Sequence, residues 1–338
     1  HQPLQLPLSF LNGGIQCASS YRTHNIIEFY ELDSSLKIVD ESCKQEGNRM
    51  STPEISFEFF PPANLKDSFR LWNTINALEG FYPKFISITY GTGNKPRALT
   101  QDLVETLLEH KDLAVAAHMT CVDMSAESTL DLVKNLAAKG LQDIVALRGD
   151  PAPDHGGAFR PHPFGFQTSC EMIAALKNLG GFKIRVAAYP QGHPESRSQA
   201  ADLDWLKRKF EAGADEAITQ FFFEADDFLR FRDACVKSGI DAPIIPGILP
   251  IENWAKTRNF AKKCGVSVPL WLEEAFERAT RDDRHDLLST AIGTELCDTL
   301  RSEGVDTLHF YTLNRPELTR DICLALGLTA KPSLKAVA

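Results

Sequence analysis

One carboxylic acid lies where a buried strand is expected. Glu58 stands between phenylalanines in the segment PEISFEFFPP, residues 53–62. An ionised carboxylate in apolar surroundings is unfavourable or takes up a proton, so we expect burial to raise the pKa of Glu58. A carboxyl that keeps its proton near neutral pH can act as a general acid. The alternative, given equal weight, is a structural ion pair between Glu58 and an Arg or Lys.

The segment ALRGDP, residues 146–151, places a guanidinium and a carboxylate two positions apart after another apolar run. Arg148 offers a planar fork to a phosphate or a carbonyl-rich ring, and Asp150 can accept hydrogen bonds from an amino-substituted heterocycle or stabilise a cation. Taken alone, the segment is better explained as a turn with a local ion pair.

Residues 188–210 combine a Pro- and Gly-rich loop with an amphipathic helix. The loop contains Tyr189 and His193. Outside the apolar stripe of the helix lie Asp202, Trp205, Arg208 and Lys209. Their spacing allows several of them to meet one ligand, although a solvated basic helix face is the commoner explanation.

Two further polar residues interrupt apolar runs. Gln220 precedes three phenylalanines, and a buried amide must find partners. It either ties the barrel lining together or contacts the edge of a flat ligand. His118 stands alone in AAHMTC, where a satisfied core histidine is the more frequent case.

Short apolar runs alternate with amphipathic helical patterns from residue 55 onward, which predicts parallel strands joined by helices. The predicted strands are Ile55–Phe60, Phe85–Thr89, Ala114–Thr120, Asp143–Gly149, Lys183–Pro190, Glu216–Phe222, Ile244–Leu249 and Thr307–Leu313. Eight such units favour a closed (β/α)8 TIM barrel of the α/β class over a doubly wound sheet. The long segment before the last strand predicts extra helices.

Alternation along Ile55–Phe60 places Ser56, Glu58 and Phe60 on the more polar face of the strand, which we expect to point into the barrel. In such a barrel, catalytic groups lie at the carboxyl ends of the strands. Polar residues of this chain gather there. Those that end or follow a predicted strand are Glu58, Thr89, Tyr90, His118, Arg148, Asp150, Tyr189, His193, Gln220, Asn314 and Arg315.

The region before Met50 has few periodic features. We therefore expect residues 1–49 to be a disordered or non-native N-terminal extension. Residues 50–330 are expected to form one barrel domain, and residues 331–338 a C-terminal tail.

Composition excludes several classes of function. The formal net charge is −9, so no broad basic field exists to attract nucleic acid or an anionic membrane. The eight cysteines show no Cys-x-x-Cys pair and no zinc spacing, so we expect neither a metal site nor a disulfide framework. No apolar run approaches the roughly 20 residues that span a bilayer. A cytoplasmic protein fits these features.

Nine blocks, in order, resemble methylenetetrahydrofolate reductases of the bacterial type, from about Ile55 to Leu328. They are SFEFFPP, ITYGTG, AHMTC, IVALRGDP, VAAYPQGHPE, DLDWLKRKFEAGAD, AITQFFF, IIPGILPI and LHFYTLNRPE. The resemblance implies an FAD-containing (β/α)8 barrel that passes a hydride from NADH or NADPH to 5,10-methylenetetrahydrofolate. The product would be 5-methyltetrahydrofolate, which links the enzyme to one-carbon metabolism and methionine synthesis.

The resemblance also assigns roles to residues. Glu58 matches the general acid that protonates the folate N10, and Asp150 the carboxylate beside flavin and pterin. Folate or nicotinamide contacts match Gln220, Phe260 and Arg315. Positions that hold FAD match Thr89, Tyr90, His118, Arg148, Gly149, Asp150, Tyr189, His193, Asp202, Trp205, Arg208 and Lys209. Trp205 stands where a small amide is common, and Lys256 where a glutamine can contact folate. Shared substrate positions imply ping-pong turnover, and the family likeness implies a homo-oligomer.

Two other functions stay open from sequence. A barrel lyase or aldolase acting on a phosphorylated small molecule could use Glu58 as acid or base and Arg148 as phosphate clamp. It would need a lysine or metal site at a strand end, and no lysine ends any predicted strand. A flavin- or folate-binding protein without turnover is the other alternative.

Overall fold

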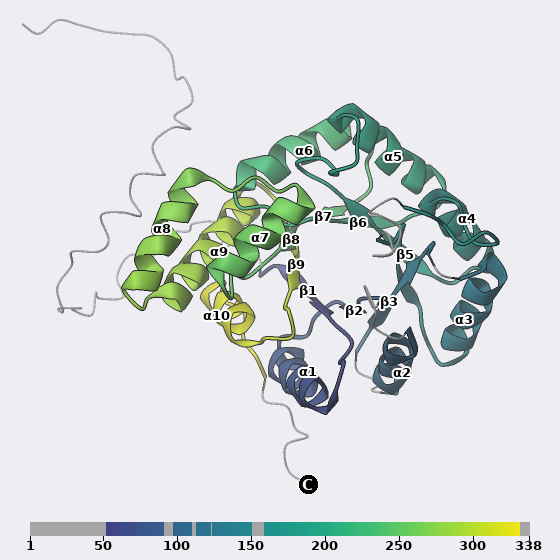
Figure 1. Ribbon diagram of the computed structural model, residues 1–338, viewed down its shortest axis with the longest axis horizontal. Coiled ribbons are helices and arrows are strands. Elements are labelled where there is room, and N and C mark those ends of the chain that lie inside the picture. The colour runs from purple at the N-terminus through teal and green to yellow at the C-terminus, as the bar shows by residue number, and fades with distance from the viewer. Residues whose placement is uncertain (1–51, 91–96, 110–112, 123, 151–158, 332–338) are drawn as a thin grey trace, which may run out of the picture. The chain divides into compact units, whose positions relative to one another are not determined.

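The computed structural model describes residues 52–331, apart from 91–96, 110–112, 123 and 151–158. Within them, parallel strands lie at the centre and helices surround them (Figure 1). The strand order is β7-β6-β5-β4-β3-β2-β1-β9-β8. The predicted (β/α)8 barrel is confirmed. The predictions for residues 1–49 and for most of the C-terminal tail fall outside the described residues.

The strands are β1 (Glu54–Phe59), β2 (Ile86–Ile88), β3 (Val115–Thr120), β4 (Asp143–Leu147), β5 (Lys183–Ala188), β6 (Glu216–Thr219), β7 (Ile244–Ile245), β8 (Gly247–Ile248) and β9 (Thr307–Tyr311). The helices up to β6 are α1 (Leu65–Leu78), the short 3-10 helix η2 (Glu79–Phe81), α2 (Arg97–Leu108), α3 (Ala126–Ala138), α4 (Ser169–Leu179) and α5 (Gln199–Glu211). Those that follow are α6 (Ala225–Lys237), α7 (Trp254–Cys264), α8 (Leu270–Arg281), α9 (His285–Ser302) and α10 (Glu317–Ala325).

The seventh barrel strand is broken in two. Proline has no backbone N–H, and Pro246 interrupts the predicted strand Ile244–Leu249 between β7 and β8. β7 pairs with β6, and β8 pairs with β9. The His309 N–H donates to the Pro246 carbonyl at 3.0 Å. The two pieces together therefore close a barrel with eight strand positions.

Alternation along β1 decides which side chains enter the barrel. Ile55, Phe57 and Phe59 are buried in the large core between the strands and the outer helices. Burying one such side chain stabilises the fold by roughly 2–3 kcal/mol. Ser56 and Glu58 take the opposite face, as successive residues of a strand must. The sequence prediction that Glu58 points into the barrel is confirmed by its contacts with β3 and β9.

The predicted extra helices before the last strand are α8 and α9, which lie with α7 beside β8 and β9 (Figure 1). They enclose a second apolar core. At its centre the rings of Trp254 and Phe276 stack at 4.8 Å with an interplanar angle of 8°. This core fixes the helix α7 that carries Phe260.

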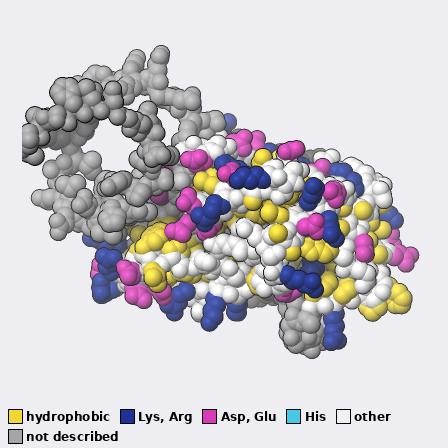
Figure 2. Space-filling view, turned by 90° about the horizontal axis from the view of Figure 1, so that it is seen from above, with side chains coloured by type: hydrophobic (Ala, Val, Ile, Leu, Met, Phe, Trp, Pro, Cys, Tyr) yellow, Lys and Arg dark blue, Asp and Glu magenta, His cyan; other side chains and the backbone are white. Residues whose placement is uncertain are grey.

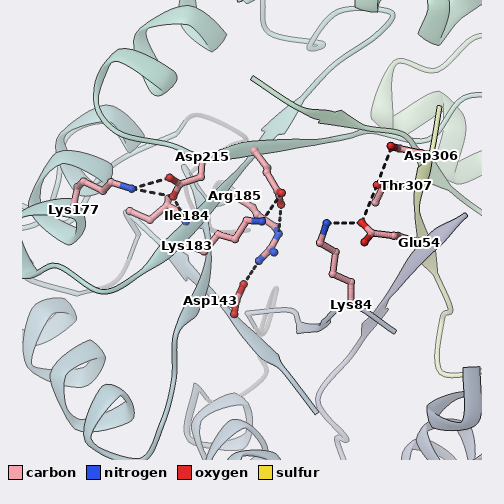
Figure 3. Close-up of polar contacts among 11 residues, drawn as sticks. Glu54, Lys84, Asp143, Lys177, Lys183, Ile184, Arg185, Asp215, Asp306 and Thr307 are labelled. Carbon is pink, nitrogen blue, oxygen red and sulfur yellow. Dashed lines mark hydrogen bonds and ion pairs between the residues drawn. The ribbon is translucent and has the colours of Figure 1, made fainter. Parts of the chain in front are cut away.

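Ion pairs close the amino end of the barrel (Figure 3). Arg185 is 1% exposed and contacts Asp143 at 2.5 Å and Glu216 at 2.9 Å. Lys183 contacts the other oxygen of Glu216 at 2.5 Å. These residues begin β4, β5 and β6, so this network ties three neighbouring strands together at their starts.

None of the helices in the described ranges is long and apolar enough to cross a membrane. Figure 2 shows basic and acidic side chains interspersed on one face of the molecule, with no broad area of a single sign.

Candidate active site

Two histidines converge on Glu58 at the carboxyl end of the barrel. Oε2 of Glu58 lies 3.3 Å from Nε2 of His118 on β3 and 3.8 Å from Nε2 of His309 on β9. The Glu58 side chain is 15% exposed, whereas that of His309 is fully buried. His118 is therefore a contact of the candidate acid and not an isolated core histidine.

These contacts reverse the expected titration of Glu58. Burial alone would raise the pKa of its carboxyl, but the facing imidazoles of His118 and His309 outweigh burial and lower the pKa to about 2. The predicted raised pKa is thus wrong for the protein without ligands. The alternative of an Arg or Lys partner is also wrong, because the groups that meet this carboxylate are imidazoles.

His309 is held from several sides. Its Nδ1 lies 2.8 Å from Oγ of Ser56, its neighbour in the β1–β9 register. Its ring stacks on Phe85 at 5.6 Å and meets Tyr311 edge-on at 5.3 Å. Sequence reasoning missed His309 and Ser56. The alternation that placed Glu58 inside the barrel also places Ser56 there, and the same rule applied to LHFYTLNR would have placed His309 and Tyr311 inside.

Arg148 at the end of β4 makes a bidentate ion pair. Its two terminal nitrogens contact the Glu195 carboxylate at 2.6 and 3.1 Å. Its guanidinium also lies 4.7 Å from the centre of the Phe159 ring. The local Arg148–Asp150 pair considered from sequence is therefore replaced by a longer-range one, while Asp150 is exposed and adds a weaker attraction to Arg148.

Gly149 is required by its backbone and its surroundings. Its φ is +90°, and a Cβ there would lie 2.8 Å from Cγ2 of Val122. Any other residue would have to move that neighbour and adopt a strained backbone. The turn that presents Arg148 and Asp150 therefore needs glycine at this position.

The loop after β5 packs an aromatic pair against α5. Tyr189 and His193 meet edge-on at 4.7 Å, and the His193 N–H donates to Oδ2 of Asp202 at 2.8 Å. Burial raises the pKa of Tyr189 to about 12. Burial and then the Arg148 charge lower the pKa of His193. This loop is thus anchored at the first turn of α5.

The basic residues of α5 divide into two kinds. Lys209 is half-buried, its ammonium donates to the Ala187 carbonyl at 2.8 Å, and burial lowers its pKa to about 8. Arg208 is exposed, pairs with Asp204 at 2.7 Å and lies 5.3 Å from the Trp205 ring centre. Arg208 and Trp205 therefore lie on a solvated helix face, the commoner explanation considered from the sequence, whereas the Lys209 side chain turns inward.

The chain after β2 is tied to its neighbours. The Thr89 N–H donates to the Phe59 carbonyl at 3.0 Å, which places Thr89 beside the end of β1. Tyr90 is buried, and its hydroxyl lies 3.9 Å from Sδ of Met124. Both residues therefore belong to the carboxyl-end rim, as predicted.

Gln220 and Phe260 lie on either side of Phe221. The Gln220 side-chain oxygen accepts from the Phe221 N–H at 3.1 Å, a local bond that links no second strand. The Phe260 ring stacks on Phe221 at 5.4 Å and is 45% exposed. Within the described residues, this bond does not tie one strand of the barrel lining to another.

Arg315, after β9, pairs with a residue that sequence reasoning missed. A terminal nitrogen of Arg315 lies 3.6 Å from Oε2 of Glu252. Burial raises the pKa of Glu252 to about 7, although Arg315 opposes the shift. Glu252 follows the seventh strand position, at the end of the barrel where catalytic groups are expected. That position could have identified it as a candidate site residue from the sequence.

The methylenetetrahydrofolate reductase family model matches residues 44–327. The 5,10-methylenetetrahydrofolate reductase of Pectobacterium carotovorum subsp. carotovorum is 42% identical over 275 residues, which cover 81% of this chain and 90% of that protein. The enzyme of Escherichia coli (strain K12) is 40% identical with the same coverage. The chain belongs to the methylenetetrahydrofolate reductase family.

A solved structure extends the fold comparison. It is titled an uncharacterized protein from Clostridium thermocellum that binds two copies of 5-methyl-5,6,7,8-tetrahydrofolic acid. Its TM-score is 0.56 at 15% identity, covering 82% of this chain and 94% of the other. At this identity the likeness supports the barrel fold alone.

Family membership decides between the functions left open by the sequence. The protein is an enzyme, a methylenetetrahydrofolate reductase, and the lyase and non-catalytic alternatives are set aside. Among the described residues, no group of three or more His, Cys, Asp or Glu side chains is arranged to hold a metal ion.

Proposed function

We propose that this reductase uses FAD to carry a hydride from NADH or NADPH to 5,10-methylenetetrahydrofolate, and that Glu58 is its general acid. The observation that supports this most directly is the partly exposed Glu58 carboxyl beside two imidazoles at the catalytic end of the barrel. Flavin chemistry supplies the hydride transfer when the cofactor is bound.

The residues predicted to hold FAD suit an anionic, flat cofactor. Lys209 offers an inward-turned ammonium that donates to a neutral carbonyl, and burial depresses its pKa, so a nearby anion would stabilise its charged form. Arg148 adds a planar guanidinium that binds a carboxylate through both terminal nitrogens. The same bidentate geometry suits a phosphate. Tyr189 and Tyr90 provide apolar surface for rings.

Glu58 would donate its proton to the folate N10 and open the ring to a reducible cation. The group that donates must carry its proton when the substrate is bound. Asp150 is exposed, so it is free to accept hydrogen bonds from a pterin and to stabilise the cation.

Gln220, Phe260 and Arg315 are assigned to the substrates. Phe260 presents an exposed face that can stack on a flat ring. Because folate and nicotinamide would share these residues, turnover would be ping-pong. The dinucleotide would bind first and leave, and folate would then occupy the same residues. We propose a cytoplasmic homo-oligomer that serves one-carbon metabolism and methionine synthesis.

The test measures the two half-reactions separately on one anaerobic preparation. The purified protein should be yellow, its flavin absorbance should bleach with NADH or NADPH, and methylenetetrahydrofolate should then restore it. Running both nicotinamides determines the preferred one. A colourless protein with no affinity for added FAD would overturn the proposal.

A further inference from the structure

A fully buried hydrogen-bonded pair lies behind Glu58. Ser56 and His309 are both 0% exposed, and Oγ of Ser56 lies 2.8 Å from Nδ1 of His309. The opposite ring nitrogen, Nε2, faces Oε2 of Glu58 at 3.8 Å. Stacking on Phe85 prevents the imidazole from turning away. The ring therefore joins a hydroxyl on one side to a carboxylate on the other.

Burial of His309 favours a neutral ring. Burial lowers its pKa, and the charges of His118 on β3 and Arg185 on β5 lower it further, while Glu58 on β1 opposes them. A neutral imidazole carries one N–H, and the hydrogen bond at one nitrogen decides which nitrogen holds it. The tautomer of His309 thus depends on its partner at Nδ1.

The Ser56 hydroxyl can direct that choice. When it donates to Nδ1, the ring proton is on Nε2 and points at the Glu58 carboxylate. The other tautomer would set a lone pair against an ionised carboxylate, which is repulsive. Ser56 also lies 3.3 Å from the Leu308 carbonyl, a longer contact than the one to the ring. The shorter bond and the charge on Glu58 both favour Nε2–H.

We propose that Ser56 and His309 are positioning residues for Glu58: Ser56 fixes the imidazole, and Nε2–H of His309 stabilises the carboxylate that forms when Glu58 gives up its proton. This inference rests on the proposed role of Glu58 as general acid. In the reaction, the O–H bond of Glu58 breaks, an N–H bond forms on the substrate, and the carboxylate is left facing the imidazole N–H. Glu58, the more exposed member, regains a proton from solvent after product release.

The contact has a directional consequence for pH dependence. A carboxyl whose ionised form is stabilised is a stronger acid, so losing the His309 donor weakens the acid and raises its pKa. Folate reduction fails at high pH because the acid form is lost. Without the facing N–H, which lies 3.8 Å away and acts through its dipole, this alkaline limb moves upward by about one pH unit, and the maximum rate falls up to about tenfold.

The experiment follows reoxidation of the pre-reduced enzyme by methylenetetrahydrofolate in single turnovers across the alkaline range. His309→Asn keeps an amide near Nδ1 but cannot reach Glu58, whereas His309→Gln places its amide near Nε2. We expect the shift in His309→Asn and a smaller one in His309→Gln. Ser56→Ala should shift the limb in the same direction, because the ring loses the bond that fixes its tautomer.

Ser87→Ala is the matched control. Ser87 is a buried serine on the neighbouring strand, and its hydroxyl makes no hydrogen bond within the described part of the chain. It should leave the pH profile unchanged, and all variants should keep flavin reduction by the dinucleotide within about twofold. If His309→Asn does not fold, Ser56→Ala against Ser87→Ala decides the question.

Two failures are distinguishable. This inference would be overturned if His309→Asn and Ser56→Ala both kept wild-type rates and pH profiles while Glu58→Gln lost folate reduction. The proposed acid role of Glu58 would then still stand. Undiminished folate reduction in Glu58→Gln would overturn the acid role itself.

Discussion

At the amino end of the barrel, buried charges meet opposite charges, whereas at the carboxyl end they meet imidazoles, carbonyls or exposed partners. Arg185 lies between two carboxylates, and Lys183 completes the network (Figure 3). At the other end, Glu58 faces two histidines and Lys209 a backbone carbonyl. The barrel therefore carries a closed ionic network at the starts of β4, β5 and β6, and groups with displaced pKa values at its opposite end.

The difference follows from what each end can do. A buried charge with a permanent partner is satisfied and has no capacity left for a ligand. A buried charge beside a neutral or titratable group stays responsive to a proton or an anion. The stacked rings of Phe85 and His309 lie between the two ends of the barrel. The Arg185 guanidinium lies 3.6 Å from the centre of the Phe85 ring, and Phe85 in turn stacks on His309.

The largest effect expected from breaking the catalytic end is on chemistry. Glu58→Gln removes the donatable proton but keeps the side chain's size. Folate reduction should fall by about 10²- to 10⁴-fold, the usual contribution of a general acid, while flavin reduction by the dinucleotide persists. Anaerobic stopped-flow absorbance of the flavin measures both. Equal losses in both half-reactions would instead indicate a damaged cofactor site.

Breaking the amino end should affect stability and leave the chemistry intact. Arg185→Met leaves the buried Glu216 and the half-buried Asp143 without their central partner, which should cost about 3–5 kcal/mol of unfolding free energy in urea. Lys84→Met is the control, because Lys84 and Glu54 form an exposed pair at 2.5 Å worth less than about 1 kcal/mol. Similar unfolding free energies for the two variants would contradict the assigned role of the amino-end network.

The features of the two barrel ends that the sequence could predict are those set by residues close together in the chain. Alternation in SFEFF correctly placed Glu58 inside the barrel, because a strand's two faces are a local property. The sign of its pKa shift was wrong, because it depends on two histidines from other strands. The Ser56–His309 contact joins residues 253 positions apart, which no local pattern encodes.

The break in the seventh strand could have been predicted. Pro246 is visible in IIPGILPI, and a proline has no backbone N–H to donate to a neighbouring strand. The partner of Arg148 could not have been predicted. Glu195 takes the place expected for Asp150 because the loop after β5 folds back toward the end of β4, which no local pattern encodes.

Lys209 tests whether the carboxyl end is responsive to an anion. Lys209→Met should weaken FAD binding by about 10- to 100-fold, as expected for a charge-assisted contact. In the unaltered protein, FAD affinity should fall as pH rises through about 8, because the free lysine then loses its proton, and the variant should lack this dependence. Fluorescence titration of apoprotein measures both. Lys207→Met, an exposed change on the same helix, should leave binding unchanged.

The smallest expected effect concerns the exposed pair at the carboxyl end. Glu195 occupies both terminal nitrogens of Arg148, so an anionic cofactor group that uses this fork must displace it. Glu195→Gln removes the competing charge, and because an exposed ion pair contributes less than about 1 kcal/mol, FAD affinity should rise by only about two- to fivefold. The gain should shrink as salt concentration increases, because salt screens the pair in the unaltered protein. Weaker FAD binding in this variant would show that Glu195 orients Arg148 for the cofactor and does not compete with it.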